Sequence, residues 1–265
     1  MLFTTVACTR EDSTARNPLV VFAASSLADV FLELEPIFEA RFADVDVQFS
    51  FSGSQVLRLQ IEQGAPADVF ASANEDHLEL LLQKNLVTKT THFASNDLAL
   101  LVSAAQREKL RTFADLPKAK KILIGVNTVP IGKYTRLVLE KAKKSYGASF
   151  ESQVMKHVVS MESNARMLRA KVELGEADAA IVYKTDTLPL HSRREHANTL
   201  GAGKPATYVI DIPKEINVAG EYVVAPIGSS ANAEFARRWI DFLQAKEGER
   251  VLRSFGFQTG SHDES

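Results

Sequence analysis

Four short segments place small polar residues where a predicted strand ends and a helix begins. They span residues 22–27, 51–54, 129–134 and 163–166. The first backbone N–H groups of a helix have no partner within the helix and carry partial positive charge, so each helix start can hold an anion. If several of these starts face one cleft, they form a binding site for a small oxyanion.

Ser26 and Ser54 are the side chains in these segments best suited to binding an anion. Helix capping, worth about 1 kcal/mol for each serine, is the simpler interpretation of either residue alone. The small neighbours of both serines favour a ligand role as well, and Gly53 permits the closest approach of another group. Tyr183 ends another predicted strand, where its hydroxyl can donate to a ligand or its ring can simply pack. Asp68 would repel an anion, so we interpret it as a scaffold residue that fixes a turn.

Other kinds of chemistry find little support in the sequence. It contains no Gly-x-Ser-x-Gly elbow, Walker loop or Gly-x-Gly-x-x-Gly motif, and nothing marks a nucleophile with its base. The histidines are scattered, and only His191 and His196 lie near each other, in a charged loop, so exposed positions are the better interpretation. An enzyme is therefore a weaker alternative than a binding protein, and we expect no catalytic residue and no cofactor.

The composition is that of an ordinary globular protein, with 45% hydrophobic and 24% charged residues in a chain of 265. This length suits one large domain or two lobes. A formal net charge of -2 and the lack of a long basic run disfavour nucleic-acid binding. No apolar stretch of the sequence reaches the roughly 20 residues that span a bilayer.

Cys8 is the only cysteine, so an internal disulfide bond is excluded. Small residues precede it, as at the end of a bacterial lipoprotein signal, where the cysteine receives a lipid. The apolar stretch before it is shorter than the usual h-region of about 7–15 residues. A lipid anchor at Cys8 and a disordered leader are therefore both open interpretations.

Strand-like and helix-like segments alternate along the chain. Apolar, β-rich runs predict strands at residues 19–22, 45–51, 67–71, 98–102, 122–126, 157–160, 179–183, 208–211 and 222–225. Helical spacing predicts helices that begin with the caps Ser26, Ser54, Asn74 and Asn164, after Pro130, and over about 107–116 and 231–252. We expect Pro36 to kink or split the first helix and Gly248 to break the last. This alternation predicts parallel α/β sheets that bind ligands beyond the carboxyl ends of their strands.

Five motifs, in their order along the chain, resemble those of the periplasmic molybdate-binding proteins of ABC importers. They lie at residues 22–27, 52–54, 60–70, 129–134 and 171–183, and the resemblance covers residues 18–258. It implies a two-lobed α/β fold of the type II periplasmic-binding kind, with parallel-rich sheets flanked by helices and a ligand cleft between the lobes. The implied division is a leader or tether (1–17), a first lobe (18–97 and 226–258), a second lobe (98–225) and a tail (259–265), with strands crossing near 96–100 and 222–226.

The resemblance also implies which residues bind the oxyanion. The hydroxyl groups of Ser26, Ser54 and Tyr183 and the backbone N–H groups of Ile131 and Ala165 would donate to it. The implied ligand is molybdate or tungstate, so molybdenum would be bound only as its oxyanion. Ile131 and Ala165 stand where alanine and valine are common in the family, which leaves the preference among molybdate, tungstate and sulfate open. Phosphate or a small carboxylate is a further alternative.

The same resemblance implies where the protein works and with what. We expect a monomer in the periplasm or otherwise outside the cytoplasm, anchored to the membrane if Cys8 carries lipid. Its partners would be the oxyanion and the transmembrane permease subunits of an ABC transporter, and not a nucleic acid.

Overall fold

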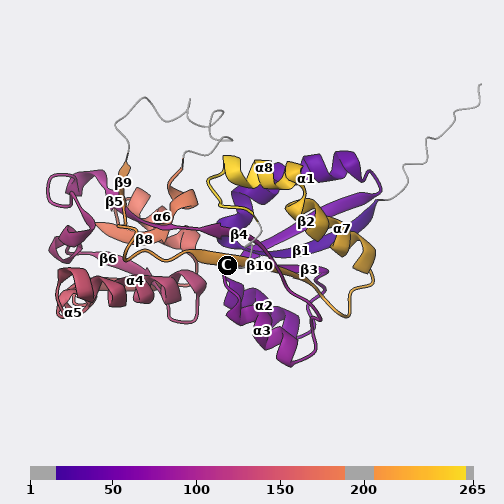
Figure 1. Ribbon diagram of the computed structural model, residues 1–265, viewed down its shortest axis with the longest axis horizontal. Helices are drawn as coiled ribbons and strands as arrows, with labels where there is room; N and C mark the ends of the chain where they lie inside the picture. Colours follow the sequence, from indigo (N-terminus) through magenta and orange to yellow (C-terminus); the bar gives the residue numbers. More distant parts are fainter. Residues whose placement is uncertain (1–15, 189–205, 261–265) are drawn as a thin grey trace, which may run out of the picture.

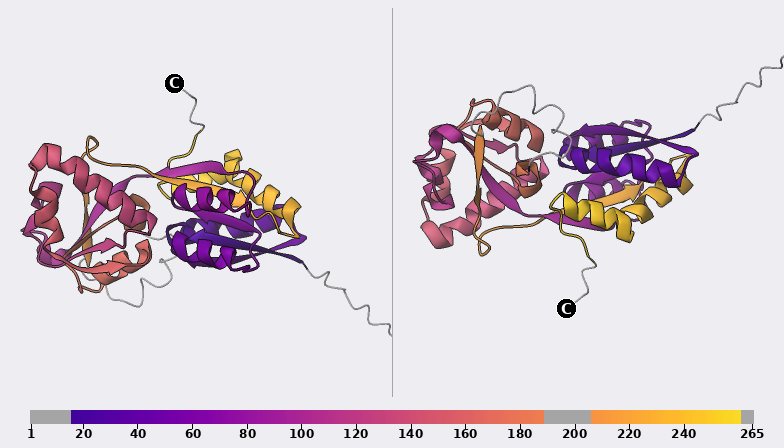
Figure 2. Two further views of the ribbon diagram at one scale, coloured as in Figure 1. Left: turned by 90° about the horizontal axis from the view of Figure 1, so that it is seen from below. Right: turned by 90° about the horizontal axis from the view of Figure 1, so that it is seen from above.

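The computed structural model describes residues 16–188 and 206–260, which form two lobes (Figure 1). Each lobe is built on one five-stranded sheet with helices on both faces. Figure 2 shows the narrow waist that joins the lobes. The two-lobed α/β fold expected from the sequence is therefore confirmed.

The first sheet is mixed. Its strands are β1 (Asn17–Ala24), β2 (Val45–Ser52), β3 (Val69–Ser72), β4 (Thr91–Asn96) and β10 (Gly220–Pro226), in the order β2-β1-β3-β10-β4. Strands β1, β2 and β3 are parallel, whereas β10 runs antiparallel to β3 and β4. One face is covered by α2 (Ser54–Glu62) and α3 (Asp76–Gln83), and the other by α1 (Ala28–Arg41), α7 (Ala233–Gln244) and α8 (Lys246–Ser254).

The second sheet repeats this arrangement. Its strands are β5 (Leu98–Ser103), β6 (Ile122–Gly125), β7 (Val158–Glu162), β8 (Ala179–Tyr183) and β9 (Thr207–Asp211), in the order β7-β6-β8-β5-β9. Strand β6 is parallel to β7 and β8, and β5 is antiparallel to β8 and β9. In Figure 1, α4 (Pro130–Tyr146) and α5 (Phe150–Met155) lie below this sheet and α6 (Ala165–Glu173) lies above it. Short 3₁₀ turns span Ser25–Leu27, Ala104–Gln106, Phe113–Lys118 and Lys184–Thr187.

The lobes are joined at two places in the described chain. Asp97 alone separates β4 from β5, and residues 212–219 connect β9 to β10. All of β10 pairs in the first sheet, although the sequence assigned residues up to 225 to the second lobe. Both sheets are mixed because the strand that enters each sheet from the other lobe runs antiparallel to its neighbours.

A cluster of aromatic rings anchors the helices of the first lobe. The Trp239 ring packs edge-on against Phe31 and Phe38, with centroids 5.4 and 5.0 Å apart, and all three side chains are fully buried. Burial of such large apolar side chains is the main source of stability in a core of this kind. The cluster fastens α7 to α1, and so holds the start of α1 at the end of β1.

Two helix boundaries differ from the sequence predictions. Helix α1 continues past Pro36, so the predicted split is wrong. Proline removes only one helical hydrogen bond, and the buried side chains of Leu34 and Phe38 keep the helix on the sheet.

The last two helices separate at Ala245, and Gly248 lies inside α8 rather than at the break. A Cβ atom on Gly248 would lie 2.1 Å from the carbonyl oxygen of Phe242, so the glycine permits close packing of α8 on the end of α7.

Other local predictions also need correction. Residues 107–116 do not form the predicted helix. One 3₁₀ turn, Ala104–Gln106, ends just before this stretch, and another, Phe113–Lys118, overlaps its end. Strand β4 and helix α5 were not predicted. Across residues 16–188 and 206–260, no helix is both long and apolar enough to cross a membrane. Cys8, the rest of the leader up to residue 15, His191, His196 and the tail from residue 261 lie outside the described residues.

Candidate ligand-binding site

The five residues predicted to bind a ligand surround one cavity between the two sheets. Ser26 and Ser54 line it from the first lobe, and Ile131, Ala165 and Tyr183 line it from the second. All five residues are buried, with exposed fractions between 1% and 8%. The structure thus brings every predicted ligand residue to a single place, while their role as ligands stays a prediction.

The cavity lies where strands of both sheets end. Its lining residues Ala24, Ser52 and Tyr183 are the last residues of β1, β2 and β8, and Ala73 directly follows β3. The loops after β6 and β7 complete the lining from the second lobe. Sheets of this type bind ligands beyond the carboxyl ends of their strands, as the sequence predicted.

Neither serine caps a helix, contrary to prediction. Ser26 lies in the 3₁₀ turn before α1, and Ser54 is the first residue of α2. The Ser26 Oγ atom accepts a hydrogen bond from the hydroxyl of Tyr222 at 2.8 Å, and the Ser54 Oγ atom accepts one from the backbone N–H of Ala73 at 3.2 Å. Since each serine acts as an acceptor toward the protein, its own proton is available to the cavity.

Ile131 and Ala165 present backbone N–H groups from the first turns of α4 and α6. Pro130, the first residue of α4, has no N–H group, so Ile131 is the first donor of that helix. Asn164 caps α6 as predicted, with Oδ1 accepting from the N–H of Met167 at 3.1 Å. The N–H groups of Ile131 and Ala165 precede the positions at which helical hydrogen bonds begin, so both can donate to a ligand.

The prediction that Asn74 caps a helix is wrong, because α3 begins only at Asp76.

Tyr183 contributes the remaining hydroxyl group. Its side chain is 1% exposed, and its hydroxyl oxygen has no hydrogen-bond partner among the described residues. Burial raises the pKa of this hydroxyl well above its ordinary value, and the neighbouring tyrosines act in the same direction. The hydroxyl therefore keeps its proton and offers it to the cavity.

The lining of the cavity is uncharged. None of the described residues that line it is acidic or basic. The cations that follow the two backbone donors are turned toward carboxylates of the first lobe: Lys133 Nζ lies 2.7 Å from Asp76 Oδ1, and Arg166 pairs with Asp29. An anion in the cavity would thus meet hydrogen-bond donors and no formal charge.

The lobes approach each other closely beside the cavity. The Gln55 Nε2 atom of α2 donates to the carbonyl oxygen of Ser163 at 2.9 Å. A Cβ atom on Gly53 would lie 2.5 Å from that same oxygen, so glycine is required for this approach. The sequence predicted that another group approaches Gly53 closely, and this group is the Ser163 carbonyl of the facing lobe.

The size of the cavity limits what it can hold. Its volume is about 20 Å³. A single water molecule needs about 10–15 Å³ by the same measure, whereas pockets for organic ligands of drug size are roughly 300–1,000 Å³. The cavity therefore suits one small ion and excludes a metabolite of ordinary size.

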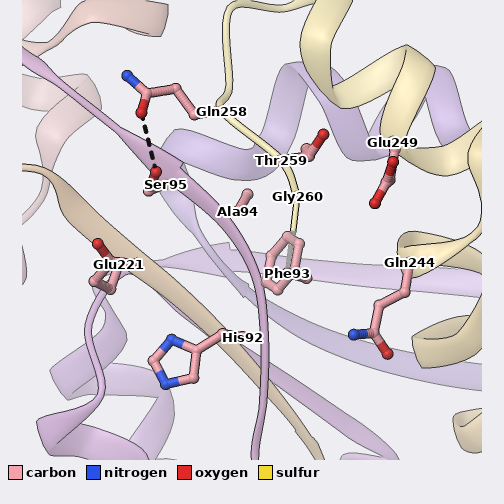
Figure 3. A pocket seen from close by; sticks show the side chains of 10 residues that line it. All are labelled: His92, Phe93, Ala94, Ser95, Glu221, Gln244, Glu249, Gln258, Thr259 and Gly260. Atoms are coloured by element: carbon pink, nitrogen blue, oxygen red, sulfur yellow. Dashed lines mark hydrogen bonds between the residues drawn. The ribbon is translucent and has the colours of Figure 1, made fainter. Parts of the chain in front are cut away.

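A second hollow, of about 990 Å³, lies in the first lobe beside β4 and β10 (Figure 3). The carboxylates of Glu221 and Glu249 lie at its two sides, and His92 stands below them in Figure 3. The Ser95 Oγ atom donates to Gln258 Oε1 at 3.4 Å across one edge. None of the predicted ligand residues lines this hollow, and its carboxylates disfavour an anion.

Asp68 does not line the cavity and lies immediately before β3. Its carboxylate accepts from the N–H of Val20 at 2.7 Å, from Ser230 Oγ at 2.6 Å and from Asn232 Nδ2 at 3.3 Å. The prediction that Asp68 is a scaffold residue is confirmed, but these three bonds tie distant segments together and none of them lies within the turn at residues 64–68 that Asp68 was expected to fix. In the part of the chain that the structure describes, no group of three or more His, Cys, Asp and Glu side chains could hold a metal ion.

Two residues of the site were missed in the sequence. Ala73 follows β3 as a small residue, and this signal could have placed it at the cavity. Tyr222 is a buried residue in the middle of β10, and nothing in its local sequence distinguishes it from a core tyrosine. Ala73 lines the cavity and its N–H group donates to Ser54, whereas Tyr222 does not line the cavity and contacts the site through its bond to Ser26.

The chain is similar to known proteins over most of its length. Residues 19–258 match the family of bacterial extracellular solute-binding proteins. The molybdate-binding protein ModA of Mycobacterium tuberculosis is 29% identical over 241 residues, which cover 90% of this chain and 84% of that protein. The resemblance inferred from the sequence motifs is therefore confirmed.

Solved structures show the same fold. The periplasmic molybdate-binding protein of Azotobacter vinelandii matches with a TM-score of 0.75 at 18% identity, covering 92% of this chain and 100% of that one. The sulfate-binding protein SubI of Mycobacterium tuberculosis matches with a TM-score of 0.78 at 17% identity, covering 93% and 88%. At these identities the two structures establish the fold alone.

Proposed function

The chain belongs to the family of bacterial extracellular solute-binding proteins, and from this premise we propose that it captures molybdate, and tungstate equally well, for an ABC importer. The prediction of a binding protein rather than an enzyme is confirmed by the family. The observation that carries the proposal is the convergence of five neutral donor residues on one cavity of about 20 Å³. The ModA relative supports molybdate as the ligand.

The donor set is sufficient for tight binding. Burying a dianion without compensation would cost far more than a domain can supply, so donors must replace its hydration. Hydrogen bonds to a charged group contribute about 1.5–3 kcal/mol each, which gives about 8–15 kcal/mol for five donors before the costs of association. A micromolar dissociation constant requires about 8 kcal/mol net. The upper part of this range leaves room for the costs of ordering and lobe closure.

Neutral donors also make the site selective. Lysine or arginine in the cavity would attract every anion, whereas fixed N–H and O–H groups respond to the positions of the ligand oxygens. A protonated anion such as hydrogen phosphate needs an acceptor, and leaving its hydroxyl unpaired is costly. Size separates molybdate and tungstate from the smaller sulfate, but barely separates the two from each other.

Sulfate is the second candidate. The observation behind it is that Ile131 and Ala165 stand where alanine and valine are common in the family that the sequence resembles, which changes the side-chain volume beside the backbone donors. Phosphate and small carboxylates remain alternatives to be tested alongside sulfate.

The partners and location follow from the same proposal. A monomer outside the cytoplasm would pass the oxyanion to the transmembrane permease subunits of the importer. We propose that Cys8 carries the lipid that holds the protein at the membrane. Fractionation of cells that produce the full-length protein tests this: the protein should be in the membrane fraction, and Cys8→Ala should release it. A soluble unsubstituted protein would contradict the anchor.

The ligand is identified by exposing the protein to a mixture of molybdate, tungstate, sulfate and phosphate, followed by native mass spectrometry and isothermal titration with each anion alone. We expect a one-to-one complex with molybdate or tungstate, and similar affinities for these two. Sulfate should bind much more weakly because of its size. Equal affinity for sulfate would overturn the size argument, and a preference for phosphate would overturn the proposed ligand.

A further inference from the structure

Tyr222 connects the strand that re-enters the first lobe to a proposed ligand residue. It lies in the middle of β10 and its side chain is fully buried. Its hydroxyl donates to Ser26 Oγ at 2.8 Å, although the two residues are 196 positions apart. A buried tyrosine hydroxyl requires a partner, and Ser26 is the acceptor that satisfies it.

The ring of Tyr222 is held in place by its neighbours. Its centroid lies 5.7 Å from that of Tyr183 and 5.3 Å from that of Phe257, which packs edge-on at 88°. Tyr222 therefore contacts a proposed ligand residue from each lobe, Ser26 through its hydroxyl and Tyr183 through its ring. This packing leaves its hydroxyl little freedom to turn away from Ser26.

The bond to Tyr222 determines how Ser26 can act. A serine hydroxyl has one proton to donate and two lone pairs with which to accept. Because Tyr222 supplies the proton of the bond between them, the proton of Ser26 is left to point into the cavity. Ser54 is arranged in the same way by the N–H of Ala73 at 3.2 Å. The hydroxyl of Tyr183, without a partner among the described residues, is a third donor.

We propose that Tyr222 is a positioning residue that directs the Ser26 hydroxyl proton to the bound oxyanion and so favours fully deprotonated anions over protonated ones. The inference rests on the proposed function and adds to it the origin of the site's selectivity. Without Tyr222, the Ser26 hydroxyl is free to rotate and to accept a hydrogen bond from a protonated anion. With Tyr222 in place, a Ser26 hydroxyl that turned its proton away from the cavity would point it at the proton that Tyr222 donates. The two protons would repel each other, and the buried tyrosine hydroxyl would lose its acceptor.

The test compares anions in the variant Tyr222→Phe, which keeps the ring and removes the hydroxyl. Isothermal titration near neutral pH measures affinity for molybdate, for sulfate and for phosphate, which carries a proton there. We expect affinity for molybdate to fall about 5- to 10-fold. The ratio of phosphate affinity to sulfate affinity should rise, by about threefold or more. Unchanged affinities, or an equal loss for all three anions, would overturn the proposal.

A double-mutant cycle shows whether Tyr222 acts through Ser26. Ser26→Ala alone should weaken molybdate binding, and adding Tyr222→Phe to it should have no further effect. Additive losses would overturn the proposal. Tyr208→Phe is the matched control, since its hydroxyl donates to the carbonyl oxygen of Leu110 in the second lobe, and it should bind every anion as the unsubstituted protein does. Melting temperatures without ligand report whether each variant is folded.

The design separates failure of this inference from failure of the proposed function. If the protein prefers sulfate to molybdate, the proposed ligand is wrong, and the same cycle run with sulfate still tests Tyr222. If no tetrahedral anion binds, both the proposed function and this inference fail.

If Tyr222→Phe does not fold, NMR of the unsubstituted protein with ¹³C at the tyrosine Cζ atoms measures the exchange of the tyrosine hydroxyl protons with water. Slow exchange at Tyr222 with and without ligand is expected, and exchange as fast as that of an exposed tyrosine would overturn the proposal.

Discussion

The guanidinium group of Arg166 pairs with the carboxylate of Asp29 across the two lobes, beside the proposed binding cavity. Arg166 directly follows Ala165, and Asp29 comes three residues after Ser26. Lys133 and Asp76 form an equivalent pair between α4 and α3. The charges near the cavity therefore bind the lobes to each other, while neutral groups line the cavity itself.

Removal of a single donor from the cavity should weaken anion binding. For Ser54→Ala and for Tyr183→Phe we expect affinity for molybdate to fall at least about 10-fold, because a hydrogen bond to a charged group contributes about 1.5–3 kcal/mol. Isothermal titration measures the loss. Ser103→Ala is the control, since Ser103 is also buried but ends β5 and does not line the cavity. If the control weakens binding as much as Ser54→Ala does, the assignment of Ser54 as a ligand residue is wrong.

The pair Arg166–Asp29 should contribute to ligand affinity through the closed arrangement of the lobes. Single substitutions alter the charge near the anion, so the informative quantity is the coupling between Arg166→Gln and Asp29→Asn. Both side chains are partly exposed, at 44% and 26%, and such pairs contribute about 0.2–1 kcal/mol. We therefore expect a coupling of at most about fivefold in the dissociation constant at low salt.

Salt provides the control for this cycle. Raising the ionic strength screens partly exposed charges, so the coupling should shrink in high salt. The same cycle on Arg253 and Glu249, an ion pair within α8, should show no coupling in ligand affinity. Coupling at α8 equal to that at Arg166 would show that the effect is not specific to the lobes.

Much of the site could be predicted because its chemistry is encoded locally. The turns that follow β1, β2, β6 and β7 each combine a strand end, small residues and a helix start, and they lie at the cavity. The positions of Ser26 and Ser54 were thus recognisable, but their roles as caps were predicted wrongly. Their hydroxyls are engaged by Tyr222 and Ala73, and contacts between residues so far apart leave no local pattern.

The fold was predicted less completely for a related reason. Strand β4 has no regular alternation of buried and exposed residues, so its pattern does not mark it as a strand. The antiparallel direction of β10 depends on how the chain returns from the second lobe, which no single segment specifies. Gly248 reads as a helix break, whereas the structure uses its missing side chain to pack α8 against Phe242.

His77 should make the stability of the protein depend on acidic pH. The side chain is 7% exposed, and both ring nitrogens lack hydrogen-bond partners among the described residues. Burial lowers the pKa of His77 from 6.5 to about 4, and the Arg58 guanidinium acts in the same direction. Between these values the unfolded chain binds more protons than the native protein, so stability rises with pH. The contribution is present above about pH 6.5 and is lost as the pH falls toward 4.

Denaturant unfolding at several pH values between 4 and 7 measures this effect. The variant His77→Leu should show a smaller change of stability over the interval than the unsubstituted protein. His92→Leu is the comparison, because His92 is partly exposed and lies 3.3 Å from the Glu75 carboxylate. If His77→Leu retains the full slope between pH 4 and 6.5, the titration belongs to other groups.

Asp68 should matter for stability and not for the ligand. Its buried carboxylate accepts hydrogen bonds from the N–H of Val20, the hydroxyl of Ser230 and the side-chain amide of Asn232, and so fastens β1, β3 and the loop before α7 together. Asp68→Ala leaves these buried donors without an acceptor, at about 1–3 kcal/mol for each group that stays unpaired. We expect the free energy of unfolding to fall by about 2–4 kcal/mol in total, since water or rearrangement will satisfy part of the set.

Asp97→Ala is the control. It removes a carboxylate whose bond to Gln258 lies at the surface, and it should change the free energy of unfolding by no more than about 0.5 kcal/mol. Both variants, where folded, should bind molybdate as the unsubstituted protein does, because Asp68 and Asp97 do not line the cavity. A selective loss of affinity in folded Asp68→Ala would show that the scaffold and the site are coupled through β3.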